Sequence, residues 1–126
     1  MSGSNERLDT SAWISPRQIA ASANTNGAVW SVTSSDLNLN VVVISDDQPI
    51  QRHLNSEVDV VVVAVDGRGV VMVDEDEFRL EPQQVLVIPK GTWRSIRPDG
   101  RSFAYMTIHR RRAGLWPTSE HDRSTG

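Results

Sequence analysis

The stretch QRHLNSEVDVVVVAVDGRG, residues 51–69, indicates the fold more directly than any other part of the sequence. Four polar residues occupy alternate positions near its start: His53, Asn55, Glu57 and Asp59. On a regular strand these side chains would all point to one face. The run VVVVAV at residues 60–65 does not alternate, which is typical of a strand covered on both faces, and Asp66-Gly67 is a turn signal. We therefore expect a line of polar side chains that leads into a buried strand, as in the pocket of a β-barrel.

Composition restricts the classes of function. The 126 residues suffice for one domain that folds without metal or disulfides, and the absence of cysteine excludes thiolate nucleophiles and cysteine-based zinc sites. The net charge of -3 argues against a nucleic-acid surface, and we expect the basic run at residues 109–112 to be a solvated strand end. The start MSGSNERLDT does not resemble a signal peptide, and no stretch approaches ~18 uninterrupted apolar residues. We expect a cytoplasmic protein without nucleic-acid or membrane partners.

Short strands separated by turn signals are predicted along most of the chain. Ser15 followed by Pro16 predicts a helix that continues to about Ala23. Strands are expected at residues 28–33, 37–45, 70–73, 78–80, 85–88, 92–97 and 103–109, with a turn at residues 98–100. In the second of these strands, Asn38 and Asn40 alternate with apolar residues on the opposite face. This pattern predicts an all-β antiparallel sandwich or barrel.

The domain boundaries follow from the same pattern. We expect a disordered leader at residues 1–12, a single barrel domain at residues 13–112 and a flexible tail at residues 113–126. Leu115 and Trp116 are the apolar residues that could attach this tail to the barrel or to a neighbouring subunit.

The sequence over about residues 37–109 resembles the paired motifs of the cupin superfamily. In the first motif, His53 stands at the first histidine, Asn55 replaces the second, and Asp59 is the preferred match for the acidic position. Gly67 and Gly69 match the glycine at the turn that follows. The resemblance implies a cupin-type double-stranded β-helix, a jelly-roll barrel, and a homodimer.

The second motif departs from the cupin pattern at its metal ligand. Pro89, Lys90 and Gly91 match the motif, but Arg94 stands where a histidine is usual. Arginine cannot ligate a metal because its guanidinium stays protonated and only donates hydrogen bonds. Our hypothesis is that Arg94 points inward and replaces the metal electrostatically; with the register shifted by one residue, Trp93 would fill the barrel instead. No cofactor is favoured, but a divalent metal held by His53, Asn55 and Asp59 is the alternative.

Several functions fit this polar set. The leading hypothesis is a small-molecule-binding cupin with a metal-free pocket for an anionic or carbonyl ligand. It would either bind a metabolite or carry out proton transfer of the isomerase, cyclase or lyase type, with His53 as base and Arg94 stabilising an oxyanion. The expected binding residues are Asn55, Glu57, Asp59, Trp93, Tyr105 and His109. The alternatives are a metal-dependent dioxygenase or isomerase and a structural or interaction protein without a ligand.

Overall fold

The computed structural model describes residues 11–111. The predicted leader, residues 1–12, lies outside this range except for residues 11 and 12, and the predicted tail, residues 113–126 with Leu115 and Trp116, lies wholly outside it. One short helix precedes seven strands: α1 (Pro16–Ser22), β1 (Gly27–Thr33), β2 (Leu37–Ser45), β3 (Ile50–Asn55), β4 (Val60–Val73), β5 (Asp76–Leu80), β6 (Val85–Ile88) and β7 (Thr92–Arg110). The predicted helix is confirmed, with Ser15 at its N-cap and Pro16 in its first turn. No helix among the described residues is long and apolar enough to cross a membrane.

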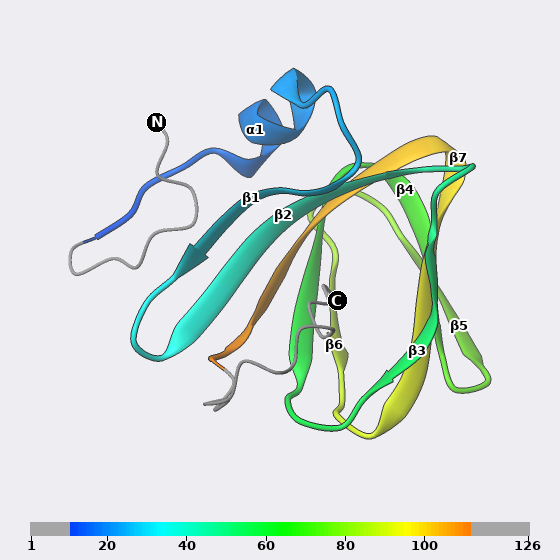
Figure 1. Cartoon of the computed structure of the whole chain (residues 1–126). Coiled ribbons are helices and arrows are strands. Elements are labelled where there is room, and N and C mark those ends of the chain that lie inside the picture. The colour runs from blue at the N-terminus through cyan, green and yellow to red at the C-terminus, as the bar shows by residue number, and fades with distance from the viewer. Residues whose placement is uncertain (1–10, 112–126) are drawn as a thin grey trace.

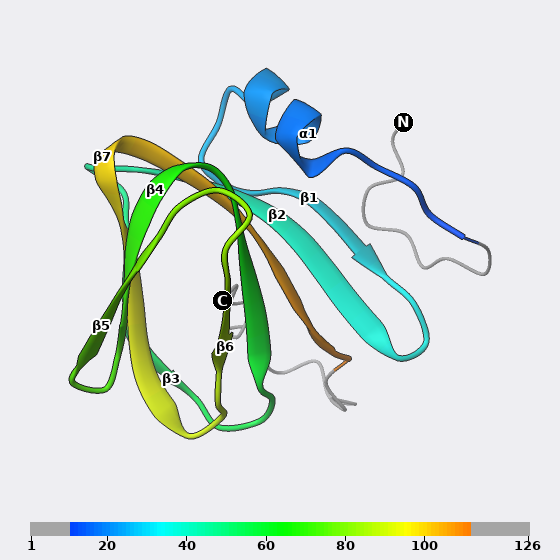
Figure 2. The ribbon, with the colours of Figure 1, turned by 180° about the vertical axis from the view of Figure 1, so that it is seen from behind.

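The strands form an antiparallel barrel because β4 and β7 are long enough to pair twice. The second half of β7 lies between β2 and the first half of β4, so one sheet runs in the order β1-β2-β7-β4-β6. The first half of β7 lies between β3 and the second half of β4, so the other sheet runs in the order β3-β7-β4-β5. Both long strands bend from one sheet into the other (Figure 1; Figure 2 from behind). The predicted all-β barrel is confirmed.

Two predicted turns prove to be bends inside continuous strands. β4 continues through Asp66-Gly67, and β7 continues through residues 98–100. The pairing of β4 with β7 shifts register between Ala64 and Asp66 and again between Gly67 and Gly69. Such β-bulges bend a strand without ending its ladder, and they explain why turn residues occur within these strands.

The predicted line of four polar side chains on one strand is wrong. β3 ends at Asn55 and β4 begins at Val60, so Glu57 and Asp59 lie in the connection between them. The cause is local, because Oδ1 of Asn55 accepts hydrogen bonds from the backbone N–H groups of Glu57 (2.9 Å) and Val58 (3.3 Å). This side-chain bond to the backbone two and three residues later turns the chain out of the extended conformation.

The core lies between the two sheets and is built mainly from valine and isoleucine. Its two aromatic residues, Phe103 and Tyr105, follow each other on the inner face of β7 with ring centroids 5.3 Å apart. The ring of Phe103 also fills the space above Gly69, where an added Cβ would overlap it. Tyr105 is fully buried, and its hydroxyl group has no hydrogen-bond partner among residues 11–111.

We expect Gly69→Ala to lower the free energy of unfolding by about 1 to 3 kcal/mol, because its methyl group would overpack the ring of Phe103. Urea unfolding measures this loss. The same substitution made in a Phe103→Leu background should cost clearly less, because the smaller side chain leaves room. Equal costs in both backgrounds would show that the contact with Phe103 is not the cause.

Tyr105 should make the fold sensitive to alkaline pH. Burial raises the pKa of its hydroxyl above the ordinary value of 10.0. A raised folded-state pKa contributes stability that is complete below the unfolded-state value and is lost as the pH rises above it, with a limiting slope of about 1.4 kcal/mol per pH unit. We expect this loss above about pH 10 in the wild type and not in Tyr105→Phe. Because Tyr105 is the only tyrosine, tyrosinate absorbance follows its ionisation directly; a normal titration midpoint in the folded protein would contradict the prediction.

Candidate functional site

Arg94 lies inside the barrel and Trp93 lies outside it. Arg94 is fully buried, whereas Trp93 is 41% exposed and carries the guanidinium of Arg52 4.7 Å above its ring. Nη2 of Arg94 donates to the carbonyl oxygen of Pro89 (3.1 Å), and its Nε donates to the carbonyl oxygen of Thr92 (3.4 Å). The inward orientation of Arg94 is therefore the one the structure adopts.

Asn55 and Asp59 brace the turn that precedes Arg94. The backbone carbonyl of Asn55 accepts a hydrogen bond from the N–H of Gly91 (2.7 Å), and Oδ1 of Asp59 accepts one from the N–H of Lys90 (2.9 Å). Together with the bond from Arg94 to Pro89, these contacts hold all three residues of the Pro89-Lys90-Gly91 turn. The motif residues thus lie together at one end of the barrel. Their role there is to hold the Pro89-Lys90-Gly91 turn by hydrogen bonds.

These residues do not fit the metal that the fold family implies. The side-chain oxygen of Asn55 is already used by two backbone N–H groups, and Asp59 is exposed and bonded to the turn. Arg94 places a positive charge where a cation would sit. Within residues 11–111, no three His, Asp or Glu side chains gather in a group that could hold an ion.

His53 is the cross-strand partner of Arg94 and is half-buried. Its Nδ1 lies 2.9 Å from the carbonyl oxygen of Gln51. A carbonyl oxygen only accepts, so Nδ1 must carry the proton, and in the neutral ring Nε2 is the basic nitrogen. His53 can therefore act as a proton acceptor through Nε2.

The other predicted residues are dispersed. The exposed Glu57 accepts a hydrogen bond at its backbone oxygen from Nη2 of Arg110 (3.3 Å). Tyr105 belongs to the core, and His109 is buried near the end of β7, with its Nδ1 2.9 Å from the carbonyl oxygen of Arg110. Trp93 and Arg94 of β7 line a surface hollow of about 300 Å³ together with Arg52 of β3, Met72 of β4 and the Asp74-Glu75 turn.

A second polar group on the inner face of the barrel was not predicted. Asn40 pairs with Ser31 on β1 and with Thr107 on β7, so their side chains share one face. The hydroxyl of Ser31 donates to Oδ1 of Asn40 (2.6 Å), and Nδ2 of Asn40 donates to the hydroxyl of Thr107 (3.1 Å). This chain of hydrogen bonds crosses three strands.

A second row runs beside the first. Asn38 pairs with Thr33 on β1 and with His109 on β7, and the hydroxyl of Thr33 donates to Oδ1 of Asn38 (2.6 Å). Along the same faces the next inward residues are the core residues Val42 and Tyr105. We call the two rows the inner polar face: Ser31, Thr33, Asn38, Asn40, Thr107 and His109.

The inner polar face retains unused hydrogen-bond donors. Within residues 11–111, no acceptor is bonded to Nδ2 of Asn38 or to the hydroxyl hydrogen of Thr107. The hydroxyl of Tyr105, two residues before Thr107 on β7, is also without a partner there. Asn38 and Asn40 are only half-buried, whereas Thr107 and Tyr105 are fully buried. The face can therefore offer donors, from the partly exposed Asn38 inward, to a molecule that carries acceptors.

The sequence contained a signal for this face. Asn38 and Asn40 alternate with Leu37, Leu39 and Val41, and Ser31 and Thr33 do the same on β1. Alternation separates two faces but does not tell which one is interior. The structure shows that Ser31, Thr33, Asn38 and Asn40 face inward, on the same face as the core residues Val42 and Ile44, and that the apolar residues between them face outward.

Comparison with known proteins supports the fold alone. No family profile matches the chain, and no curated protein sequence matches it. Two solved structures cover most of it: a protein from Bacillus halodurans (TM-score 0.73, 16% identity, covering 84% of this chain and 85% of that one) and a protein from Neisseria meningitidis (TM-score 0.69, 16% identity, covering 79% and 100%).

A third solved structure supplies the description of the fold. It is an RmlC-like cupin family protein with a double-stranded β-helix from Methanocaldococcus jannaschii, similar at a TM-score of 0.56 and 9% identity over 62% of this chain and 72% of that one. The two bent sheets, the Pro89-Lys90-Gly91 turn and the inward position after it agree with that fold. The chain is therefore a small cupin-fold domain, a jelly-roll β-barrel.

Proposed function

We propose that the barrel binds a small organic molecule rich in hydrogen-bond acceptors, such as a carboxylate or a carbonyl compound, on the inner polar face. The observation that carries this proposal is the reversed polarity of β1, β2 and the second half of β7, whose polar side chains face the barrel interior. Buried polar groups cost free energy when they lack partners, and Nδ2 of Asn38 and the hydroxyls of Thr107 and Tyr105 keep donors without acceptors among residues 11–111, which a ligand could supply.

The charges of the interior favour an anionic ligand. Arg94 is buried, and the buried residues among positions 11–111 include no aspartate or glutamate. A positive charge acts more strongly in the low-dielectric interior than in water. A carboxylate or a phosphate would therefore be attracted to this interior, whereas a cationic ligand would be repelled.

A catalytic version of this function has one specific observation in its favour. The hydrogen bond of His53 to Gln51 leaves Nε2 as the basic nitrogen beside Arg94. A base next to a fixed cation suits proton abstraction from a carbon whose neighbouring carbonyl oxygen develops negative charge. His53→Ala separates the two versions, because it should abolish turnover and leave binding on the inner polar face intact.

We expect small carboxylates and carbonyl compounds that raise the melting temperature of the wild type to bind about fivefold more weakly to Asn38→Ala, because one hydrogen bond is worth about 1 kcal/mol. Thr107→Val, which removes a buried hydroxyl without changing the shape of the side chain, should act in the same direction. Isothermal titration calorimetry measures both. Asn26→Ala is the matched control, because this exposed amide bonds to Ser45 and Gln48 outside the barrel. Absence of binding across the compound series, or equal affinity in all three variants, would refute the proposal.

We expect the purified protein to acquire no stoichiometric iron, manganese, nickel or zinc on incubation, because Arg94 occupies the interior and the carboxylate of Asp59 is bonded to the turn. Plasma mass spectrometry of the wild type and of His53→Ala measures this. Near-stoichiometric metal in the wild type that disappears in His53→Ala would instead support the metal-dependent alternative.

A further inference from the structure

The outer face of the sheet β3-β7-β4-β5 carries the hollow of about 300 Å³ that Trp93 lines, which we call the outer hollow. Trp93 and Ser95 flank the inward-facing Arg94 on β7, so their side chains point to the outer face. Met72 of β4 is the cross-strand partner of Ser95. Ser95 is the smallest of the lining residues, which leaves room between its larger neighbours Arg52, Trp93 and Met72.

The guanidinium of Arg52 is held in place at the outer hollow. It stacks on the ring of Trp93, 4.7 Å from the centroid. Stacking uses the flat face of a guanidinium and leaves the N–H donors at its edge available. Within residues 11–111, these donors form no hydrogen bond and no ion pair. The stack therefore presents an oriented set of donors, which suits a carboxylate.

Two carboxylates line the same hollow. Asp74 and Glu75 form the turn between β4 and β5. Oδ1 of Asp74 accepts a hydrogen bond from the N–H of Trp93 (3.0 Å), and the N–H of Asp74 donates to the carbonyl oxygen of Trp93 (2.8 Å). These bonds fix the position of Asp74 and leave its Oδ2 without a partner among residues 11–111. Oδ2 of Asp74 and the exposed Glu75 can therefore accept hydrogen bonds from an ammonium group.

The opposite charges of the outer hollow face one another without pairing. Arg52 lies on β3 and Asp74 follows β4, with β7 between these two strands. Neighbouring strands are about 4.8 Å apart, so the two backbones are separated by about 10 Å. The stack on Trp93 holds the guanidinium on its own side, and no carboxylate among residues 11–111 forms an ion pair with it. Such a separation suits a ligand that carries both charges.

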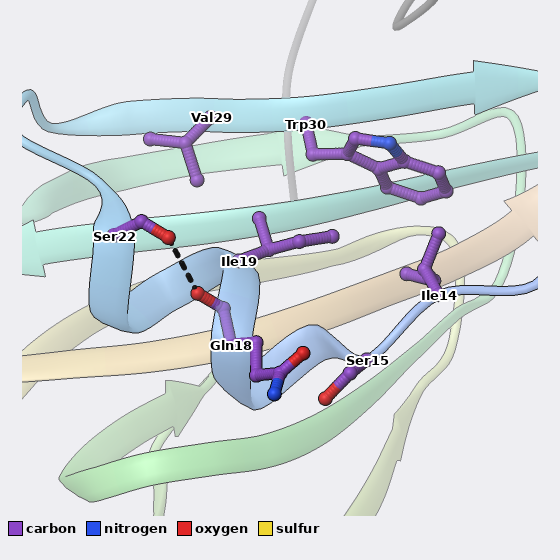
Figure 3. Close-up of a pocket in the computed structure, with 7 residues that line it drawn as sticks. All are labelled: Ile14, Ser15, Gln18, Ile19, Ser22, Val29 and Trp30. Carbon is purple, nitrogen blue, oxygen red and sulfur yellow. Dashed lines mark hydrogen bonds between the residues drawn. The ribbon is translucent and has the colours of Figure 1, made fainter. Parts of the chain in front are cut away.

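A second groove provides a contrast. It has a volume of about 470 Å³ and lies between α1 and β1, where Ile14, Ile19 and Trp30 contribute to its lining (Figure 3). Among the described residues that line this groove, none is charged. It therefore offers no partner to an ionic ligand, and the indole of Trp30 can serve as an internal reference for binding at Trp93.

We propose that the outer hollow binds a small zwitterion, such as an amino acid or a dipeptide, with its carboxylate on Arg52 and its ammonium group on Asp74 and Glu75. The volume of the hollow is at the lower end of the ~300–1,000 Å³ that is typical of small-molecule sites, which fits a ligand of this size. The ring of Trp93 lies between the two charged ends and offers contact to the apolar part of the ligand. This inference goes beyond the proposed function and does not depend on it.

A ¹⁵N NMR titration of the full chain with glycine, β-alanine, γ-aminobutyrate and glycylglycine tests the proposal, because these probes carry both charges at different separations. At least one probe should shift the indole N–H signal of Trp93, which its loss in Trp93→Phe identifies. The indole signal of Trp30 should stay in place. The N-acetyl and the amide derivative of the best probe should each bind at least tenfold more weakly, because each lacks one charge.

Charge-removing variants show which end of the ligand each side of the hollow binds. Arg52→Gln should weaken binding of the best probe about tenfold and abolish the preference for the free carboxylate over the amide. Asp74→Asn/Glu75→Gln should abolish the preference for the free amine over the N-acetyl derivative. Asparagine at position 74 keeps an oxygen for the N–H of Trp93 and tolerates the positive φ of 52° there, so the turn should stay intact.

Arg68→Gln and Asp66→Asn are the matched controls. Both residues are exposed at the bend of β4 and do not line the hollow, so the same changes of charge there should leave the affinity unchanged. Asn38→Ala should also leave it unchanged, which separates the outer hollow from a ligand on the inner polar face. Absence of a Trp93 shift with every probe would overturn the proposal, as would equal affinity for the zwitterion and its two singly charged derivatives.

Discussion

The double pairing of β4 with β7 is the constraint on which the rest of the structure depends. Each strand serves both sheets, so the bends near Gly67 and Pro98 must coincide for the ladder to continue. The ring of Phe103 occupies the space that Gly69 leaves free and so fixes the two strands at the bend. Arg94 on the first half of β7 and Thr107 on the second both take their places from this pairing.

The sequence was sufficient to predict the class of fold but not the positions at which its long strands bend. Apolar strands and turn signals predicted a barrel correctly, and Pro16 located the helix. Gly67 and residues 98–100 have the composition of turns, yet they bend strands that continue, because a bulge and a turn use the same residue types. The distinction depends on pairing between segments about thirty residues apart, which local sequence does not contain.

The candidate site shows a different limit of sequence reasoning. The spacing of the cupin motifs correctly brought Asn55, Asp59 and Arg94 to one end of the barrel. Their chemistry there could not be predicted, because the Asx turn at Asn55 ended the strand and turned Asp59 toward the Lys90 N–H. The backbone carbonyl of Asn55 and the side chains of Asp59 and Arg94 instead form the hydrogen bonds that hold the Pro89-Lys90-Gly91 turn. The spacing of a motif can therefore predict where its residues lie without predicting which hydrogen bonds they make.

On β1, β2 and the second half of β7, several polar side chains face the barrel interior while apolar side chains face outward. Each polar residue turned inward, such as Asn40 or Thr107, removes apolar burial from the core, and each apolar partner turned outward leaves area in contact with water. In an isolated domain both consequences lower stability. A ligand that binds only the folded barrel would offset the first of these losses, because binding to the folded state alone stabilises it by mass action.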